Sequence, residues 1–73
     1  MEVMQVCSTF IAGIGYVEEF TWLRIVFKSG VYEDYSGLIK DDYYAIRAEL
    51  GKVFNARIKN KIKPFAKGVW QFY

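Results

Sequence analysis

The hydrophobic period of this chain changes once, close to Gly37, and this change restricts the folds that it can adopt. Before Gly37, apolar side chains alternate with polar or small ones, which is the period of a strand. After it, they recur every three or four residues, which is the period of a helix face. With only 73 residues, the chain makes one domain. The order of the two periods therefore predicts a small α+β domain, strands first and helices second.

Three runs before the change have strand character. Residues 11–17 alternate large apolar side chains with glycines on the opposite face. Residues 22–28 form the clearest strand, because three apolar side chains share one face: Leu23, Ile25 and Phe27. Residues 31–35 follow after a Ser-Gly turn. Such short connections between consecutive strands indicate an antiparallel meander.

Two helical stripes follow, and the first has members at i, i+4, i+7 and i+11: Ile39, Tyr43, Ile46 and Leu50. Asp41 and Asp42 suit the positive end of its dipole, and Gly51 can end it. The second stripe stops before Pro64 and has three members: Phe54, Ile58 and Ile62. Residues 69–73 form either a fourth strand or an aromatic tail. We therefore expect a three-stranded meander, four-stranded in the first case, followed by two helices packed on one face.

Charge is divided unevenly along the chain. Residues 1–50 hold eight acids and four bases, whereas residues 51–73 hold no acid and six bases: Lys52, Arg57, Lys59, Lys61, Lys63 and Lys67. Such a basic segment is an electrostatic footprint for a polyanion such as RNA. The apolar stripe of the second helix spans about 80° with bases on both flanks. The helix is therefore either an amphipathic surface helix or a phosphate-binding one, with Asn55 or Asn60 contacting sugar or base.

Aromatic residues make up 19% of the chain, more large apolar side chains than one small core readily hides. Four are candidates for a binding surface: Trp22, Tyr32, Tyr35 and Trp70. They either stack on bases or pack as half-buried sheet residues. Trp22 shares a strand face with Arg24 and Lys28, which would make an open sheet face basic and aromatic. Two outcomes are open for a further set of aromatics: Trp22, Trp70, Phe72 and Tyr73. They either remain uncovered and bury each other in a homodimer, or they are satisfied within a monomer whose last segment folds back as a fourth strand.

Several kinds of chemistry are missing. Without histidine and with one cysteine, one chain cannot assemble a Cys/His zinc site or a Ser-His or Cys-His nucleophile pair. The adjacent acids are expected to be solvated: Glu18–Glu19, Glu33–Asp34 and Asp41–Asp42. Cys7 is expected to be an inert, partly buried thiol. We therefore expect no catalytic residue, metal or cofactor. Since neither a signal peptide nor a membrane span is evident, we expect a cytoplasmic protein without a membrane partner.

A series of short motifs resembles a known family. Ile-Ala-Gly-Ile-Gly-Tyr at 11–16 leads into a Leu-x-Ile-x-Phe strand and a Ser-Gly turn. A Val-Tyr strand with a second tyrosine, a Tyr-bearing helix and a Gly-x-x-Phe-Asn-x-x-Ile-Lys segment at 51–59 come next. This order resembles the KTSC domain, which occurs at the C-terminus of some lysyl-tRNA synthetases and as a standalone bacterial or phage protein. The resemblance covers about residues 6–62 of a single domain spanning 1–73, with 63–73 as a basic, aromatic extension.

The resemblance implies RNA or another polyanion as a partner, because RNA binding has been suggested for the family. Members carry a central Tyr-x-Tyr, whereas Tyr32 and Tyr35 are separated by two acids. A bulge at Glu33–Asp34 would return Tyr35 to the expected face. Ile62 stands where the family commonly has an aromatic residue. We expect a non-enzymatic module that binds RNA or another nucleic acid through its basic second helix. The alternative is a protein-interaction or inhibitory accessory protein, of mobile-element or phage type, that uses exposed aromatic surface.

Overall fold

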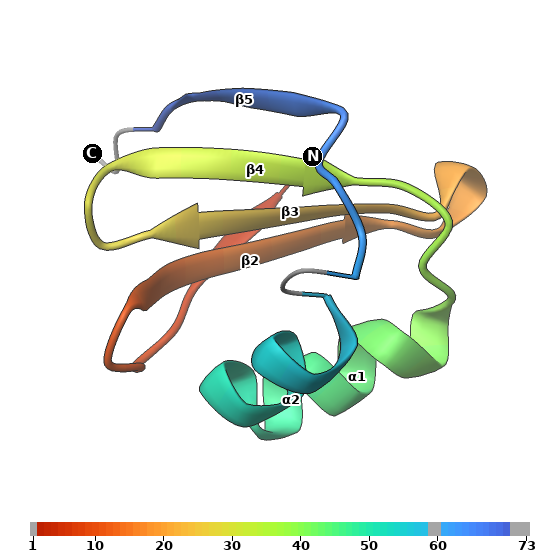
Figure 1. The fold of residues 1–73 in the computed structure, drawn as a ribbon, viewed down its shortest axis with the longest axis horizontal. Helices are drawn as coiled ribbons and strands as arrows, with labels where there is room; N and C mark the ends of the chain where they lie inside the picture. The colour runs from red at the N-terminus through yellow and green to blue at the C-terminus, as the bar shows by residue number, and fades with distance from the viewer. Residues whose placement is uncertain (1, 59–60, 71–73) are drawn as a thin grey trace.

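The computed structural model describes residues 2–58 and 61–70, and within them the chain forms one antiparallel sheet, two α-helices and one short 3₁₀ helix (Figure 1). The five strands lie in chain order across the sheet: β1 (Val3–Gln5), β2 (Ile11–Val17), β3 (Trp22–Phe27), β4 (Val31–Tyr35) and β5 (Ala66–Val69). The helices are η1 (Glu18–Phe20), α1 (Lys40–Ala48) and α2 (Leu50–Arg57). The expected α+β meander is thus confirmed, and the strand count is corrected to five.

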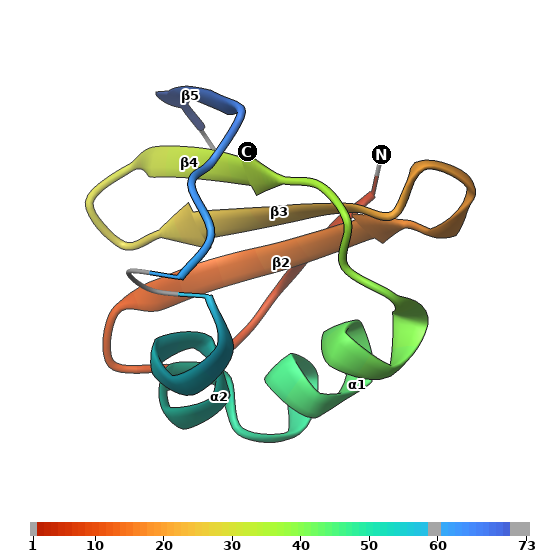
Figure 2. The same cartoon turned by 45° about the vertical axis from the view of Figure 1, so that its right-hand side comes forward.

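Both α-helices cover the same face of the sheet. The chain leaves the sheet after β4, forms α1 and α2 beneath it, and returns through residues 61–65 to β5 (Figures 1 and 2). β5 pairs with β4 from Val31↔Val69 to Asp34↔Ala66. The segment beyond the second helix therefore contributes an edge strand, three residues earlier in the chain than expected, and residues 71–73 lie outside the described residues.

The register between β3 and β4 is regular. Arg24 lies opposite Asp34, and Val26 lies opposite Tyr32, with no residue left over. The expected bulge at Glu33–Asp34 is therefore wrong, and Tyr32 and Tyr35 lie on opposite faces of β4, since neighbouring strand residues alternate. The irregularity falls instead in β2, between its first and third residues. Each acid of β4 has a partner on its own side of the sheet, so the strand accommodates both without a bulge.

The core lies between the sheet and the two helices. Its sheet side is made of buried residues of β2, β3 and β4: Ile11, Ile14, Leu23, Ile25 and Tyr35. Ile14, Leu23 and Ile25 lie on the predicted strand faces, whereas the burial of Ile11 and Tyr35 was not predicted. Its helix side comes from the two predicted stripes and the connection before them: Leu38, Ile46, Phe54 and Ile58. This packing confirms the alternation in β3 and the second helical stripe, whereas in the first stripe Ile46 is buried but Ile39 is 57% exposed.

The helix boundaries differ from the prediction. α1 ends at Ala48 and α2 begins at Leu50, because Glu49 takes a non-helical conformation with φ −141° and ψ 71°. Gly51 therefore lies inside α2 rather than after α1. A Cβ at Gly51 would come 3.2 Å from Cε1 of Phe10, so the glycine allows α2 to approach the loop before β2. α2 itself ends at Arg57, short of the expected boundary before Pro64.

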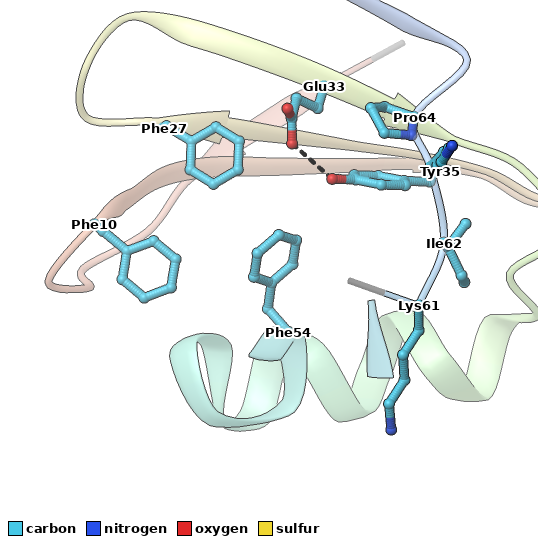
Figure 3. A pocket seen from close by; sticks show the side chains of 9 residues that line it. Phe10, Phe27, Glu33, Tyr35, Phe54, Lys61, Ile62 and Pro64 are labelled. Atoms are coloured by element: carbon cyan, nitrogen blue, oxygen red, sulfur yellow. Dashed lines mark hydrogen bonds between the residues drawn. The ribbon is translucent and has the colours of Figure 1, made fainter. Parts of the chain in front are cut away.

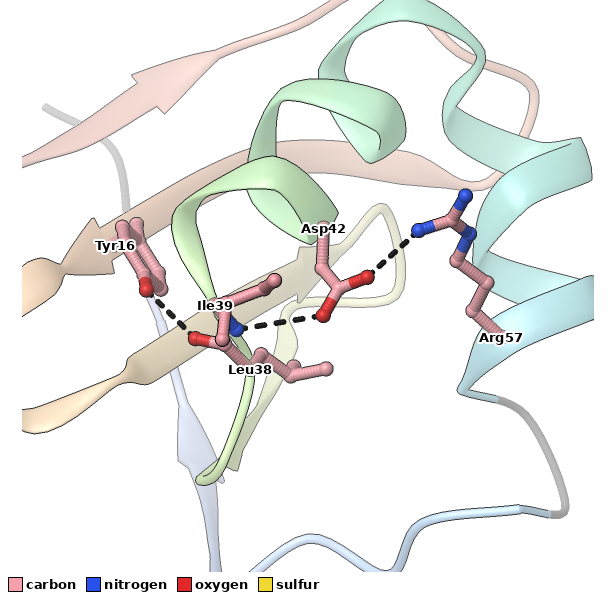
Figure 4. Close-up of polar contacts among 5 residues, drawn as sticks. All are labelled: Tyr16, Leu38, Ile39, Asp42 and Arg57. Atoms are coloured by element: carbon pink, nitrogen blue, oxygen red, sulfur yellow. Dashed lines mark hydrogen bonds and ion pairs between the residues drawn. The ribbon is translucent and has the colours of Figure 1, made fainter.

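Polar contacts join the start of α1 to α2 and to β2 (Figure 4). Asp42 Oδ2 accepts the backbone N–H of Ile39 at 3.3 Å, and its Oδ1 accepts from Arg57 at 2.6 Å. The Tyr16 hydroxyl donates to the carbonyl of Leu38 at 2.6 Å. Asp42 thus stabilises the helix start as expected and also holds α2 against α1.

Candidate functional site

The sheet face away from the helices carries an ion pair enclosed by aromatic rings, which we call the Arg24 cluster. Arg24 Nε and Nη2 donate to the two carboxylate oxygens of Asp34 at 2.6 and 2.8 Å. The guanidinium carbon lies 5.3, 4.2 and 5.4 Å from the ring centroids of Trp22, Tyr32 and Trp70. Asp34 is only 1% exposed. Because the two charges cancel inside the cluster, this face is not the open basic surface that the sequence suggested.

A pocket opens on the other side of the sheet, between β3–β4, α2 and the segment that leads to β5 (Figure 3). Its volume is about 600 Å³, within the range of small-molecule sites. We call it the Glu33 pocket, and nine residues line it: Phe10, Phe27, Glu33, Tyr35, Phe54, Lys61, Ile62, Lys63 and Pro64.

Three phenylalanines from three separate segments make a continuous aromatic wall in the pocket. Phe10 and Phe27 stack with ring centroids 6.3 Å apart and planes at 13°. Phe54 of α2 meets Phe27 edge-on at 5.8 Å and Phe10 at 6.1 Å. Figure 3 shows the ring of Phe27 beside the carboxylate of Glu33 and the rings of Phe10 and Phe54 below it. Phe54 is only 4% exposed, so Phe10 and Phe27, which are half-buried, provide the π surface on which a flat ligand can stack.

Glu33 is the acidic group of the pocket. Its Oε1 accepts the hydroxyl of Tyr35 at 2.6 Å, and its Oε2 lies 3.3 Å from Nζ of Lys67. Burial, followed by this hydrogen bond, raises the pKa of Tyr35 above its usual value of 10.0. The phenol therefore stays protonated and keeps donating to Glu33 over the ordinary pH range. An ionised carboxylate has about four acceptor positions, so two remain for a ligand.

Lysines stand at the rim of the pocket. Lys61 and Lys63 are exposed, and neither forms an ion pair within the part of the chain that the structure describes. The side chain of Lys61 points away from the aromatic rings (Figure 3). Lys52 is also exposed and borders a second hollow that shares Phe10 with the Glu33 pocket. Three exposed lysines therefore lie in or next to the Glu33 pocket: Lys61 and Lys63 at its rim and Lys52 in the adjoining hollow.

The predicted cation set is divided by the structure. Lys52 and Asn55 are exposed on α2, while Lys61 and Lys63 stand at the pocket rim. Arg57 is paired with Asp42 and Lys67 with Glu33, so two of the six bases have acidic partners. Lys59 and Asn60 lie outside the described residues.

The predicted aromatic set is divided as well. Trp22, Tyr32 and Trp70 gather around Arg24, whereas Tyr35 lies across the sheet in the Glu33 pocket. Phe72 and Tyr73, expected to join Trp22 and Trp70 at a dimer interface, lie outside the described residues. The four candidates therefore do not form one surface.

Sequence reasoning missed the pocket residues. Phe27 and Phe54 were assigned to core stripes, and the Glu33–Asp34 pair was expected to be solvated. That expectation is wrong, because Asp34 is buried and Glu33 is hydrogen-bonded inside a pocket. The spacing of Glu33 and Tyr35 at i and i+2 on one strand was the available signal. Cys7, expected to be partly buried, is exposed.

Two further features of the described residues bear on function. No group of three His, Cys, Asp or Glu side chains among residues 2–58 and 61–70 could hold a metal ion. No helix in the same ranges is long and apolar enough to cross a membrane.

Comparisons with known proteins identify the fold. No family model matches the chain, and no curated protein matches it. Among solved structures, the chain is similar to the crystal structure of a KTSC domain protein from Yersinia pestis. The TM-score is 0.79 with 22% sequence identity, over 96% of this chain and 97% of that one. The chain therefore has the fold of a KTSC domain, as its motifs suggested.

Proposed function

We propose that this protein is a non-enzymatic module that binds single-stranded RNA, with one base in the Glu33 pocket and phosphates on the surrounding lysines. The observation that carries the proposal is the combination in one place of an aromatic wall, one carboxylate and unpaired rim lysines. RNA-binding surfaces commonly stack an unpaired nucleobase on aromatic side chains and bind the phosphate backbone with lysine and arginine side chains.

The charges around the pocket decide between two ligand classes. Aromatic rings beside a carboxylate can hold an organic cation. Here, however, the carboxylate of Glu33 already lies 3.3 Å from Lys67, and Lys61 and Lys63 line the same pocket. Three lysines against one carboxylate leave an excess of positive charge, which repels a cation and attracts a phosphate. A nucleotide satisfies both parts, because its base is flat and its phosphate is anionic.

An apolar protein side chain fits this pocket less well. It would cover the aromatic wall but would leave the free acceptor positions of Glu33 without hydrogen-bond donors. Glu33 keeps its bonds to Tyr35 and Lys67, but burying its remaining acceptor positions without donors costs about 1–3 kcal/mol. A base supplies donors as well as a π surface, which favours nucleic acid over an apolar anchor.

The test is the fluorescence anisotropy of a labelled, mixed-sequence single-stranded RNA at about 50 and 200 mM salt. If Lys52, Lys61 and Lys63 each neutralise a phosphate, the log–log salt slope is about −2. Lys63→Gln should lower its magnitude by about 0.7 and weaken binding to every sequence alike. Lys40→Gln, the same change on α1, is the matched control and should leave the slope unchanged. No binding at low salt, or equal effects of the two variants, would refute the proposal.

A protein partner or a second copy of the chain is the second candidate, and the edge strand favours it. Val69 of β5 is 76% exposed and Phe65, just before β5, is 58% exposed. An open strand edge with apolar side chains is a template for pairing with another strand. Sedimentation of the intact chain and of Val69→Lys tests this, since a charge on an edge strand opposes such pairing. A monomer for both would exclude self-pairing.

A further inference from the structure

We propose that the Glu33 pocket selects guanine over the other three bases, an inference that rests on the proposed RNA binding. Specificity in such a site comes from polar groups that meet the edge of a base, because stacking on aromatic rings tolerates any base. Glu33 is the polar group that can make this distinction, since it offers only acceptors when ionised.

The hydrogen bonds already made by Glu33 define what it can still accept. Tyr35 donates to Oε1 at 2.6 Å, and Lys67 lies 3.3 Å from Oε2. Each carboxylate oxygen has about two acceptor positions, so one remains on each. The Tyr35 hydroxyl is a donor already directed at Glu33. The carboxylate of Glu33 therefore presents two adjacent acceptor positions to a ligand, one on each oxygen.

Guanine is the base that matches two adjacent acceptors. Its Watson–Crick edge carries the N1–H and N2–H donors side by side, so both can bond to one carboxylate, as the arginine fork does. Adenine and cytosine offer one amino donor beside a ring nitrogen acceptor, which repels the second oxygen. Uracil places its single N3–H between two carbonyl oxygens. Adenine, cytosine and uracil therefore each leave at least one oxygen of Glu33 without a donor or facing another acceptor, which is unfavourable in a site that is partly shielded from water.

The aromatic wall sets the affinity that all bases share. Phe10 and Phe27 are stacked on each other at 6.3 Å, so a base lies against the wall rather than between the two rings. Their contribution is the same for purines and pyrimidines to a first approximation. Guanine selection is therefore expected to depend on Glu33 and to be separable from phosphate binding by Lys61 and Lys63.

The experiment uses labelled uridine nonamers in which only the central base is varied: uracil, adenine, cytosine, guanine or hypoxanthine. Guanine should bind roughly tenfold or more tightly than uracil, as expected for an added charge-assisted hydrogen bond. Hypoxanthine lacks the 2-amino group and should fall between the two. Glu33→Gln should abolish the guanine preference and keep the salt-dependent binding. Glu19→Gln, the same change of charge on η1, is the matched control and should keep the preference.

The outcomes separate the two proposals. Equal affinity for all five nonamers would overturn guanine selection and leave RNA binding standing. No binding by any nonamer at low salt would overturn both. Because the hypoxanthine comparison leaves the protein unchanged, the inference stays testable even if Glu33→Gln disturbs folding, which circular dichroism would reveal.

Discussion

Removing either Arg24 or Asp34 alone should strongly destabilise this domain, whereas replacing both residues together should cost little. The pair's two hydrogen bonds of 2.6 and 2.8 Å join β3 to β4, and the side chains are 15% and 2% exposed. Removing one partner of a buried pair costs about 3–5 kcal/mol, because the other charge stays buried and unpaired. Replacing both partners with apolar side chains removes that penalty.

The two single variants should lose different amounts of unfolding free energy. Arg24→Leu leaves the carboxylate of Asp34 buried without its partner and removes the guanidinium from the three aromatic rings around it, so the full loss of about 3–5 kcal/mol is expected. Asp34→Leu leaves the guanidinium near the same rings, which attract a cation by about 0.5–2 kcal/mol. The expected loss for Asp34→Leu is therefore smaller, about 2–4 kcal/mol. The double variant should lie within about 1–2 kcal/mol of the wild type.

Urea unfolding gives the measurement, with the fluorescence of Trp22 as one probe and far-ultraviolet circular dichroism as another. A domain of this length has roughly 4–11 kcal/mol of stability, so both single variants should be measured at low temperature. Arg24→Lys, which keeps the charge but not the paired geometry, should cost about 1.5 kcal/mol. Losses below about 1 kcal/mol for both single leucine variants would contradict the reasoning. The reasoning would also be contradicted if the double variant were no more stable than the less stable of the two single leucine variants.

Three further predictions follow from packing and titration. Gly68→Ala should cost about 1–3 kcal/mol in thermal unfolding, because the new Cβ would overlap the ring of Tyr32, and the same change should cost less when it is made in a Tyr32→Leu variant than in the wild type. Ile46→Ala should cost about 2–5 kcal/mol in urea unfolding, since Ile46 is fully buried, and a smaller loss would mean that the core collapses around it. Tyr35 has a raised pKa in the folded state, so its contribution is complete below about pH 10 and is lost as the pH rises above it. Tyr35→Phe should remove that part of the alkaline fall in Tm, and an unchanged pH profile would show that Tyr35 is not its source.

Local pattern was enough to predict the inner strands and the core. The alternation of Leu23 and Ile25 in β3 and the helical stripe through Phe54 and Ile58 depend only on backbone period, which neighbouring residues set. The same pattern could not reveal β1, because three residues of mixed exposure carry no period. It also misplaced the end of α2 and the role of Gly51, because both depend on which other segment packs against them.

The sequence by itself therefore determined the fold class, the buried faces of β3 and α2, and the excess of basic residues after Gly51. Only the tertiary structure decided which charges remain free. Arg24 and Arg57 meet acids that lie 10 and 15 residues away on neighbouring elements, and these contacts arise from strand register and helix packing. The Glu33 pocket has the same origin, because its aromatic wall is drawn from the loop before β2, from β3 and from α2. Side chains far apart in sequence meet only when the elements that carry them are packed, and no local period encodes that meeting.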